Sequence, residues 1–126
     1  MKLNDNNTND IVSTMSYESQ FNQIKSLTDP RGNSTLYIYD YDLLTSDPKY
    51  GTVGDLIKIM HPTTTAGTAI TEFDYNSDGQ VTEIIDPNGN ITQYTYETTT
   101  GYLASIIQDP SGINAVSSFT YDAFGN

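Results

Sequence analysis

Apolar and polar residues alternate along several short segments of the chain, as in 71–75 (TEFDY) and 91–96 (ITQYTY). A period of two with many β-branched and aromatic residues is typical of strands. No window of a dozen residues shows the 3.6-residue apolar spacing of a helix. The pattern therefore predicts an all-β chain without helices. The expected strands are 21–28, 34–41, 54–60, 68–75, 80–86, 91–97, 102–108 and 115–121.

The strands are separated by turn sequences that recur as a unit. The clearest copy spans 75–90 and reads as a Tyr, a turn residue, a Gly, an apolar strand and then Asp-Pro-x-Gly. Further copies span 96–112 and 17–33, and a more divergent one spans 54–62, where His61 takes the place of the turn Asp. The last residues, 121–126, match the opening of a fifth unit. Because Pro presets φ, Asp bonds nearby amides and Gly accepts positive φ, these sequences predict tight reversals.

The repeat predicts a tandem array of antiparallel β-hairpins that form a curved or spiralling open sheet. Its unit-opening tyrosines are Tyr17, Tyr39, Tyr75, Tyr96 and Tyr121. A single hairpin is barely stable in water, so each unit depends on its neighbours, and the expected partners are other repeats of the same or adjacent chains. We expect the array to span 16–126, with a polar, disordered segment at 1–15 and a longer rim loop at 43–52.

The aromatic residues of the strands admit two interpretations. In the favoured one they form ladders across the sheet, where cross-strand aromatic pairs contribute roughly 0.2–1 kcal/mol each. In the alternative they form a track that stacks on sugars. The residues concerned are Tyr39, Phe73, Tyr75, Tyr94, Tyr96, Phe119 and Tyr121.

Charge and composition exclude several classes of function. The chain has 16 acidic and 5 basic residues and a net charge of −11, which opposes binding to nucleic acid phosphates. It has no Cys, so disulfides and thiolate metal sites are excluded. No segment approaches the length of apolar residues needed for membrane insertion.

Asp74, Asn76 and Asp78, followed by Gly79, have the spacing of the first half of a calcium loop. An EF-hand also needs a Glu at its twelfth position, which here is Ile85, whereas Glu83 comes two residues too early. The same residues are explained by the repeat turn, so a turn is favoured over a weak calcium site. No other cofactor is expected. His61, the only histidine, is expected to be a turn residue, and no motif places a nucleophile beside it. We therefore predict no catalytic residues and no enzyme activity.

The recurring Tyr-Asp/Asn/Glu, Gly, Leu/Val and Asp-Pro-x-Gly elements resemble the YD or RHS repeats of bacterial RHS proteins, toxin-complex shell components and teneurins. This resemblance covers roughly 16–126. It implies a spiralling strip of hairpins that closes into a hollow shell, which in the toxins encloses a C-terminal toxic polypeptide. The shell's self-cleavage motif is rich in Arg and Tyr. Only its generic turn is matched, at 109–112, so no protease activity is carried over.

The leading functional hypothesis is a structural module of a secreted or cell-surface shell that contains or displays a toxin polypeptide. A second hypothesis is an adhesin-like module that binds a surface glycan or a protein through rim loops such as 43–52. A third is a subunit that assembles into a filament, because open sheet edges invite pairing between chains.

Overall fold

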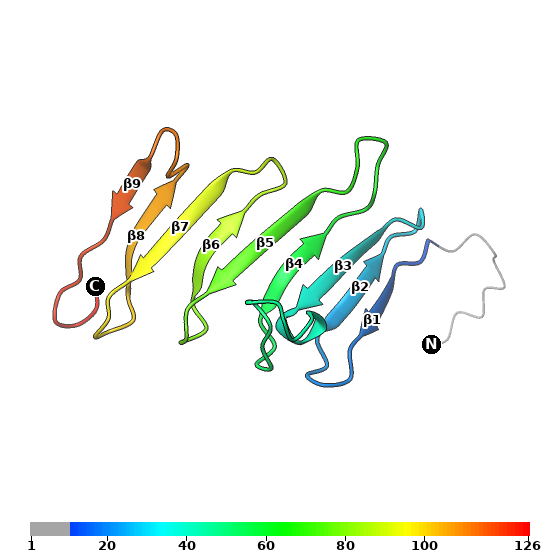
Figure 1. Cartoon of the computed structure of the whole chain (residues 1–126), viewed down its shortest axis with the longest axis horizontal. Coiled ribbons are helices and arrows are strands. Elements are labelled where there is room, and N and C mark those ends of the chain that lie inside the picture. Colours follow the sequence, from blue (N-terminus) through cyan, green and yellow to red (C-terminus); the bar gives the residue numbers. More distant parts are fainter. Residues whose placement is uncertain (1–10) are drawn as a thin grey trace, which may run out of the picture.

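The computed structural model describes residues 11–126 and contains one antiparallel sheet of nine strands, which lie side by side in sequence order (Figure 1). The prediction of an all-β fold built from antiparallel hairpins in one open sheet is confirmed. The strands are β1 (Thr14–Tyr17), β2 (Ile24–Thr28), β3 (Ser34–Tyr39), β4 (Leu56–Met60), β5 (Ile70–Tyr75), β6 (Val81–Ile85), β7 (Ile91–Tyr96), β8 (Leu103–Gln108) and β9 (Ala115–Ser118).

The eight predicted strands correspond to β2–β9, and β1 was not predicted. Its sequence, TMSY, is only four residues long, too short for its alternation to indicate a strand, so only its pairing with β2 identifies it as one. β1 begins at Thr14, inside the segment 1–15 that was expected to be disordered, so the expected start of the array at residue 16 is two residues late. Residues 1–10 of that segment lie outside the described residues.

The predicted strand 34–41 is shorter than expected, because β3 ends at Tyr39 and a short 3-10 helix, η1 (Asp40–Asp42), follows. Asp42 accepts a hydrogen bond from the Tyr39 amide at 2.9 Å, and Asp40 accepts one from the Tyr41 amide at 2.8 Å. Such local bonds from acidic side chains compete with the strand ladder. η1 is the one helical turn among residues 11–126, and it corrects the prediction that the chain has no helix.

A register shift recurs at the same place in every second strand pair. It falls at Tyr17, Tyr39, Tyr75 and Tyr96, the last residues of β1, β3, β5 and β7. At each shift one residue of the partner strand is skipped, as when Tyr75 pairs with Val81 directly after Asp74 pairs with Glu83. Bulges of this kind bend a strand and increase its twist. The repeat is therefore a repeat of backbone geometry as well as of sequence.

The sheet is a single layer with almost no enclosed core (Figure 1). Among the described residues only Tyr39, Ile57 and Asp40 are buried, at 5 %, 4 % and 2 % exposure. All three lie in or beside the segment where η1 and its loop pack against the strands. Most side chains of the strands are half-buried, as expected where one strand is flanked by two others but nothing covers the face.

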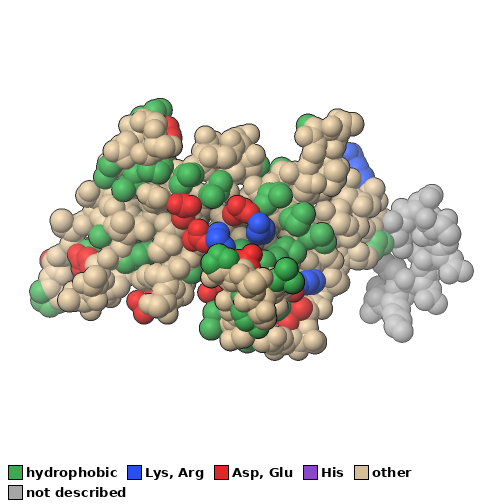
Figure 2. Space-filling view, viewed as in Figure 1, with side chains coloured by type: hydrophobic (Ala, Val, Ile, Leu, Met, Phe, Trp, Pro, Cys, Tyr) green, Lys and Arg blue, Asp and Glu red, His purple; other side chains and the backbone are tan. Residues whose placement is uncertain are grey.

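The register separates the two faces of the sheet by chemistry. On one, which we call the aromatic face, Tyr37 lies opposite Ile59, Phe73 opposite Ile84 and Tyr94 opposite Ile106. On the other, the charged face, Lys58 lies opposite Glu72, and Glu83 lies between Asp74 and Gln93. Figure 2 shows acidic and basic side chains gathered near the middle of one face, beside a protruding loop.

Candidate functional site: the tyrosine ladder and the rim turns

Each unit-opening tyrosine from Tyr39 onward donates its hydroxyl to the backbone carbonyl of the residue that begins an earlier strand: β2, β4, β6 or β8. Tyr39 bonds the Ile24 carbonyl at 2.7 Å, and Tyr75 bonds that of Leu56 at 2.9 Å. Tyr96 bonds Val81 at 2.7 Å and Tyr121 bonds Leu103 at 2.8 Å. We call these four bonds the tyrosine ladder.

The ladder links three successive strands at every step. The accepting residues are the first residues of β2, β4, β6 and β8, and each is also the register partner of the previous unit's tyrosine. Leu56, for example, pairs with Tyr39 and accepts from Tyr75. Burial raises the pKa of Tyr39, Tyr75 and Tyr96, which keeps their hydroxyls protonated as donors. Each new hairpin is thus joined to the last by the same bond.

This ladder differs from the one that the sequence predicted. None of Phe73, Tyr75, Tyr94 and Tyr96 stacks ring to ring with another across the described sheet; the ring pairs there are Phe21–Tyr41, Tyr39–Tyr41 and Tyr102–Tyr121. The reason is the strand order, because the aromatic-rich strands β5 and β7 are separated by the aliphatic strand β6. Phe73 consequently packs opposite Ile84.

The rim turns share one mechanism. Oδ1 of the first turn residue accepts the backbone amides two and four residues later, at 2.8–3.0 Å, in the turns that begin at Asp29, Asn76, Asp86 and Asp122. Asn90 also donates its side-chain amide to Asp86 at 2.7 Å, and this bond is the main cause that lowers the pKa of Asp86. The carboxylates that recur with the repeat period are therefore occupied by turn amides.

His61 fills the place of a turn Asp, as predicted. Its backbone amide donates to the Ala69 carbonyl at 2.9 Å, which matches the bonds from Asp29 to Asn33 and from Asp86 to Asn90. The main-chain closure is kept, so the turn does not depend on a carboxylate at this position.

The three residues of the predicted calcium loop are held in separate interactions. Asp74 forms an ion pair with Lys49 at 2.6 Å. Asn76 uses its oxygen for the amides of Asp78 and Gln80. Asp78 is exposed in the turn. Within residues 11–126 no group of three or more His, Cys, Asp and Glu side chains is placed to hold a metal ion, and calcium binding by these residues stays a prediction.

The long connection between β3 and β4, predicted as the rim loop 43–52, runs from Asp40 to Asp55 and is mostly exposed, but its first residue, Asp40, is buried. Asp40 lies inside it and accepts the amides of Val53 at 3.0 Å and Gly54 at 3.1 Å. A Cβ at Gly51 would collide with the Asp40 carboxylate, so the close approach of the loop requires glycine there. We call 40–55 the insertion.

The insertion also contacts the hairpins on both sides. Gln23, in the β1–β2 connection, donates to the Gly54 carbonyl at 2.9 Å, and Phe21 packs on Tyr41 with ring centroids 5.6 Å apart. Burial and the negative charge of Glu18 raise the pKa of Tyr41 to about 12. On the other side Lys49 reaches Asp74 on β5. The insertion therefore connects three successive hairpins along one rim.

Sequence reasoning missed the role of Asp40, although a signal was present. Asp40 follows Tyr39 just as Glu18, Asn76, Glu97 and Asp122 follow their tyrosines, so it is the acceptor that opens a turn. The long insertion after it hid this equivalence.

The repeat and its geometry agree with the comparisons to known proteins. The family model of the RHS repeat matches residues 75–114, which begin at a ladder tyrosine and include β6, β7 and β8. Residues 75–114 form an RHS repeat. The interpretation of the chain as YD or RHS repeats is thereby confirmed for this segment.

Two crystal structures, TcdB2-TccC3-Cdc42 and TcdB2-TccC3, contain a region with the fold of this chain. In each case the TM-score is 0.69, the identity is 20 %, and 90 % of this chain is covered. The chain spans about 5 % of the length of the solved chains that it matches. The fold that this chain shares with those structures thus extends well beyond the segment 75–114. No curated protein matches the sequence.

Within residues 11–126 the structure has no helix long and apolar enough to span a membrane. The prediction that the chain does not insert into a membrane rests on the sequence.

Proposed function

We propose that this chain is a wall segment of an RHS-like shell on the cell surface or outside the cell, which contains or displays a polypeptide and performs no catalysis itself. The observation that supports this most is the tyrosine ladder, which joins each hairpin to the preceding one by the same bond. An architecture of that kind extends by addition of identical units, as walls of repeat proteins do.

The burial pattern supports the same proposal. A nine-stranded sheet with only three buried residues among those described leaves the side chains of its aromatic face half-buried, with no second layer over them. Apolar surfaces of such extent mark places where another polypeptide packs. In the RHS-like shells that the chain resembles, the enclosed toxin polypeptide would be that partner, and further repeats would continue the sheet.

The experiment measures binding to an unfolded polypeptide that stands in for the contents of a shell. Fluorescently labelled α-lactalbumin, reduced and carboxymethylated so that it stays unfolded, is titrated with the chain and followed by anisotropy. We expect binding that weakens when Tyr94 on the aromatic face is changed to Thr. Glu83→Gln, on the charged face, is the matched control and should bind as the wild type does.

Circular dichroism of both variants confirms that the sheet is retained. Failure of the wild-type chain to bind the unfolded polypeptide, or equal weakening by Tyr94→Thr and Glu83→Gln, would contradict the containment role. Turnover of peptide, ester or glycoside substrates by the purified chain would contradict the absence of catalysis.

A further inference from the structure

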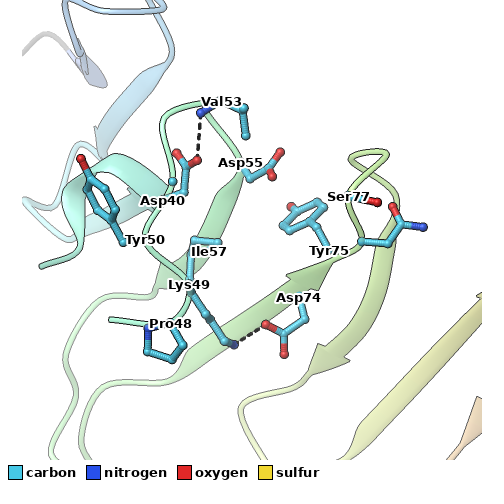
Figure 3. A pocket seen from close by; sticks show the side chains of 12 residues that line it. Asp40, Pro48, Lys49, Tyr50, Val53, Asp55, Ile57, Asp74, Tyr75 and Ser77 are labelled. Carbon is cyan, nitrogen blue, oxygen red and sulfur yellow. Dashed lines mark hydrogen bonds and ion pairs between the residues drawn. The ribbon is translucent and has the colours of Figure 1, made fainter. Parts of the chain in front are cut away.

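A pocket of about 470 Å³ opens between the insertion and the end of β5 with the turn that follows it (Figure 3). Its volume is in the range of small-ligand sites. The lining residues that matter for recognition are Lys49, Tyr50, Asp55, Asp74, Tyr75 and Ser77. The regular β5–β6 and β7–β8 connections are too short to fold over the strands in this way, so the pocket exists because the insertion does.

Two acidic side chains of the pocket, Asp40 and Asp74, already have partners. The Asp40 carboxylate accepts three backbone amides, from Tyr41, Val53 and Gly54. Asp74 is paired with Lys49 at 2.6 Å, and Figure 3 shows this pair across the pocket from Asp55. The pocket therefore contains its own cation. A cationic ligand would have to compete with Lys49, and an anionic ligand would face the Asp55 carboxylate.

The polar groups that remain are one acceptor and two hydroxyls. Among the hydrogen bonds of the described residues, the side chains of Asp55, Ser77 and Tyr50 take part in none, but Figure 3 shows the Tyr50 hydroxyl pointing away from the pocket, so Asp55 and Ser77 are the groups available to a ligand. Asp55 is half-buried, and burial together with the neighbouring Asp40 charge raises its pKa. A half-buried carboxylate without a donor gains from a ligand that supplies one.

The pocket also has an apolar surface. Ile57, 4 % exposed, lies in it, and so does the ring of Tyr75, whose hydroxyl is fixed on the Leu56 carbonyl at 2.9 Å. A ring held at its hydroxyl end keeps a constant orientation, which suits it for packing against the C–H face of a ligand. The Lys49–Asp74 pair beside it presents donors and acceptors together.

We propose that this pocket binds one saccharide residue of an uncharged glycan. Sugar hydroxyls both donate and accept, so they match a site with an unpaired carboxylate, a serine hydroxyl and an ion pair better than a ligand of either charge does. Asp55 accepts from sugar hydroxyls, and Ser77 and Lys49 donate to sugar oxygens. The Tyr75 ring packs on the apolar face of the sugar. This binding activity is independent of the containment role proposed above.

The test follows the backbone amides of the full chain by NMR during titration with single probes. The probes are the methyl glycosides of glucose, galactose, mannose and N-acetylglucosamine, with L-argininamide as the cationic probe. We expect at least one glycoside to shift the amide signals of Tyr50 and Ser77, and argininamide to leave them unchanged.

Asp55→Asn keeps the shape of the side chain and should weaken binding of that glycoside about tenfold, since a charged acceptor becomes a neutral one. Asp78→Asn is the matched control, because it makes the same chemical change one residue from Ser77 but outside the pocket, and it should bind as the wild type does. The spectra of both variants report whether the fold is kept.

Three results would overturn the proposal: no glycoside shifts the pocket amides, Asp55→Asn binds as tightly as Asp78→Asn, or argininamide binds in place of the glycosides. If Asp55→Asn failed to fold, Ser77→Ala would replace it, with weaker glycoside binding expected and unchanged binding contradicting the site.

Discussion

The insertion between β3 and β4 and the short turn between β5 and β6 occupy the same place in the repeat but differ greatly in length. Both close with the same main-chain bond at 2.9 Å, from Asp40 to the Asp55 carbonyl in one and from Asn76 to the Gln80 carbonyl in the other. In both, the residue after the ladder tyrosine accepts backbone amides with its side chain. The closure is therefore independent of the length of chain between its ends.

The two turns differ in what this acceptor must support. Asn76 organises an exposed turn of a few residues, whereas Asp40 is 2 % exposed and holds together a segment that would otherwise leave its amides unpaired. In this insertion, length is added to the repeat together with a buried carboxylate that organises the added residues.

Replacing these two acceptors should give the largest difference between the turns. Asp40→Ala removes a buried carboxylate and leaves the amides of Tyr41, Val53 and Gly54 without this acceptor, and we expect a loss of about 3 kcal/mol in the free energy of unfolding. Asn76→Ala removes the acceptor of the Asp78 and Gln80 amides, which can then bind water, and it should cost about 1 kcal/mol. Urea unfolding of both variants measures the difference. Equal losses would show that the insertion is not held by Asp40.

Removal of a ladder hydroxyl should have the same effect in both regions. Tyr39→Phe and Tyr96→Phe each delete one bond to a carbonyl, to Ile24 and to Val81, and each should cost about 1 kcal/mol in urea unfolding. Tyr37→Phe, on the same strand as Tyr39 but outside the ladder, is the control and should change stability by less than either. If a ladder variant were as stable as Tyr37→Phe, the bond from the tyrosine hydroxyl to the carbonyl would not stabilise the sheet.

The acidic residues of the two regions should respond to pH with opposite signs. The side-chain bond from Asn90 and the turn amides lower the pKa of Asp86, so its contribution to stability is complete above the ordinary carboxyl pKa and is lost as the pH falls through the lowered value. Burial raises the pKa of Asp55, so its contribution is complete below the ordinary carboxyl pKa and is lost as the pH rises through the raised value.

Unfolding free energies measured across the acid range for Asp86→Asn and Asp55→Asn check this contrast. Relative to the wild type, Asp86→Asn should lose less stability on acidification. Asp55→Asn should gain stability over the wild type as the pH rises. The same sign of change in both variants would contradict the assignment.

The smallest effect is expected from the ion pair that ties the insertion to β5. Lys49 and Asp74 are each about one third exposed, at 33 % and 35 %, so solvent screens their attraction. Lys49→Met should cost about 0.5 kcal/mol at low salt and less at high salt. Lys58→Met, which breaks the pair with Glu72, is the matched control within the sheet. A loss above that of Asp40→Ala would make the ion pair the main support of the insertion.

The sequence predicted the regular part of this molecule well because the residues that determine each regular turn lie within a few positions of one another. The Asp86 turn and the alternation of β7 are local, and the structure confirms both. β1 has little pattern of its own and is a strand only through its contact with β2, so it was missed. The ring ladder was wrong because the strand order places the aliphatic strand β6 between the aromatic-rich strands β5 and β7.

The pocket was missed for a different reason. Asp55, Tyr75 and Ser77 come from two connections that are far apart in the sequence and meet only through the folded insertion. The rim loop 43–52 was singled out from its length, but no pattern in it indicates which strand it packs against.

The central claim is that the segment from one ladder tyrosine to the next is a structural repeat, which can be removed while the rest of the sheet still folds. Deletion of residues 76–96 tests it most directly, because this deletion joins Tyr75 to Glu97, pairs β5 with β8 in the register that β7 had, and removes one ladder bond complete with both partners. Deletion of residues 76–90 is the control, since it removes β6 with its turns and joins β5 to β7 without a reversal.

We predict that the chain lacking residues 76–96 keeps a β-sheet circular dichroism spectrum and unfolds cooperatively in urea, with an m-value reduced in proportion to the surface removed. The chain lacking residues 76–90 should lose cooperative unfolding. Equal disruption by the two deletions would contradict the account, because it would show that the hairpins are parts of one indivisible fold and not repeats of a wall.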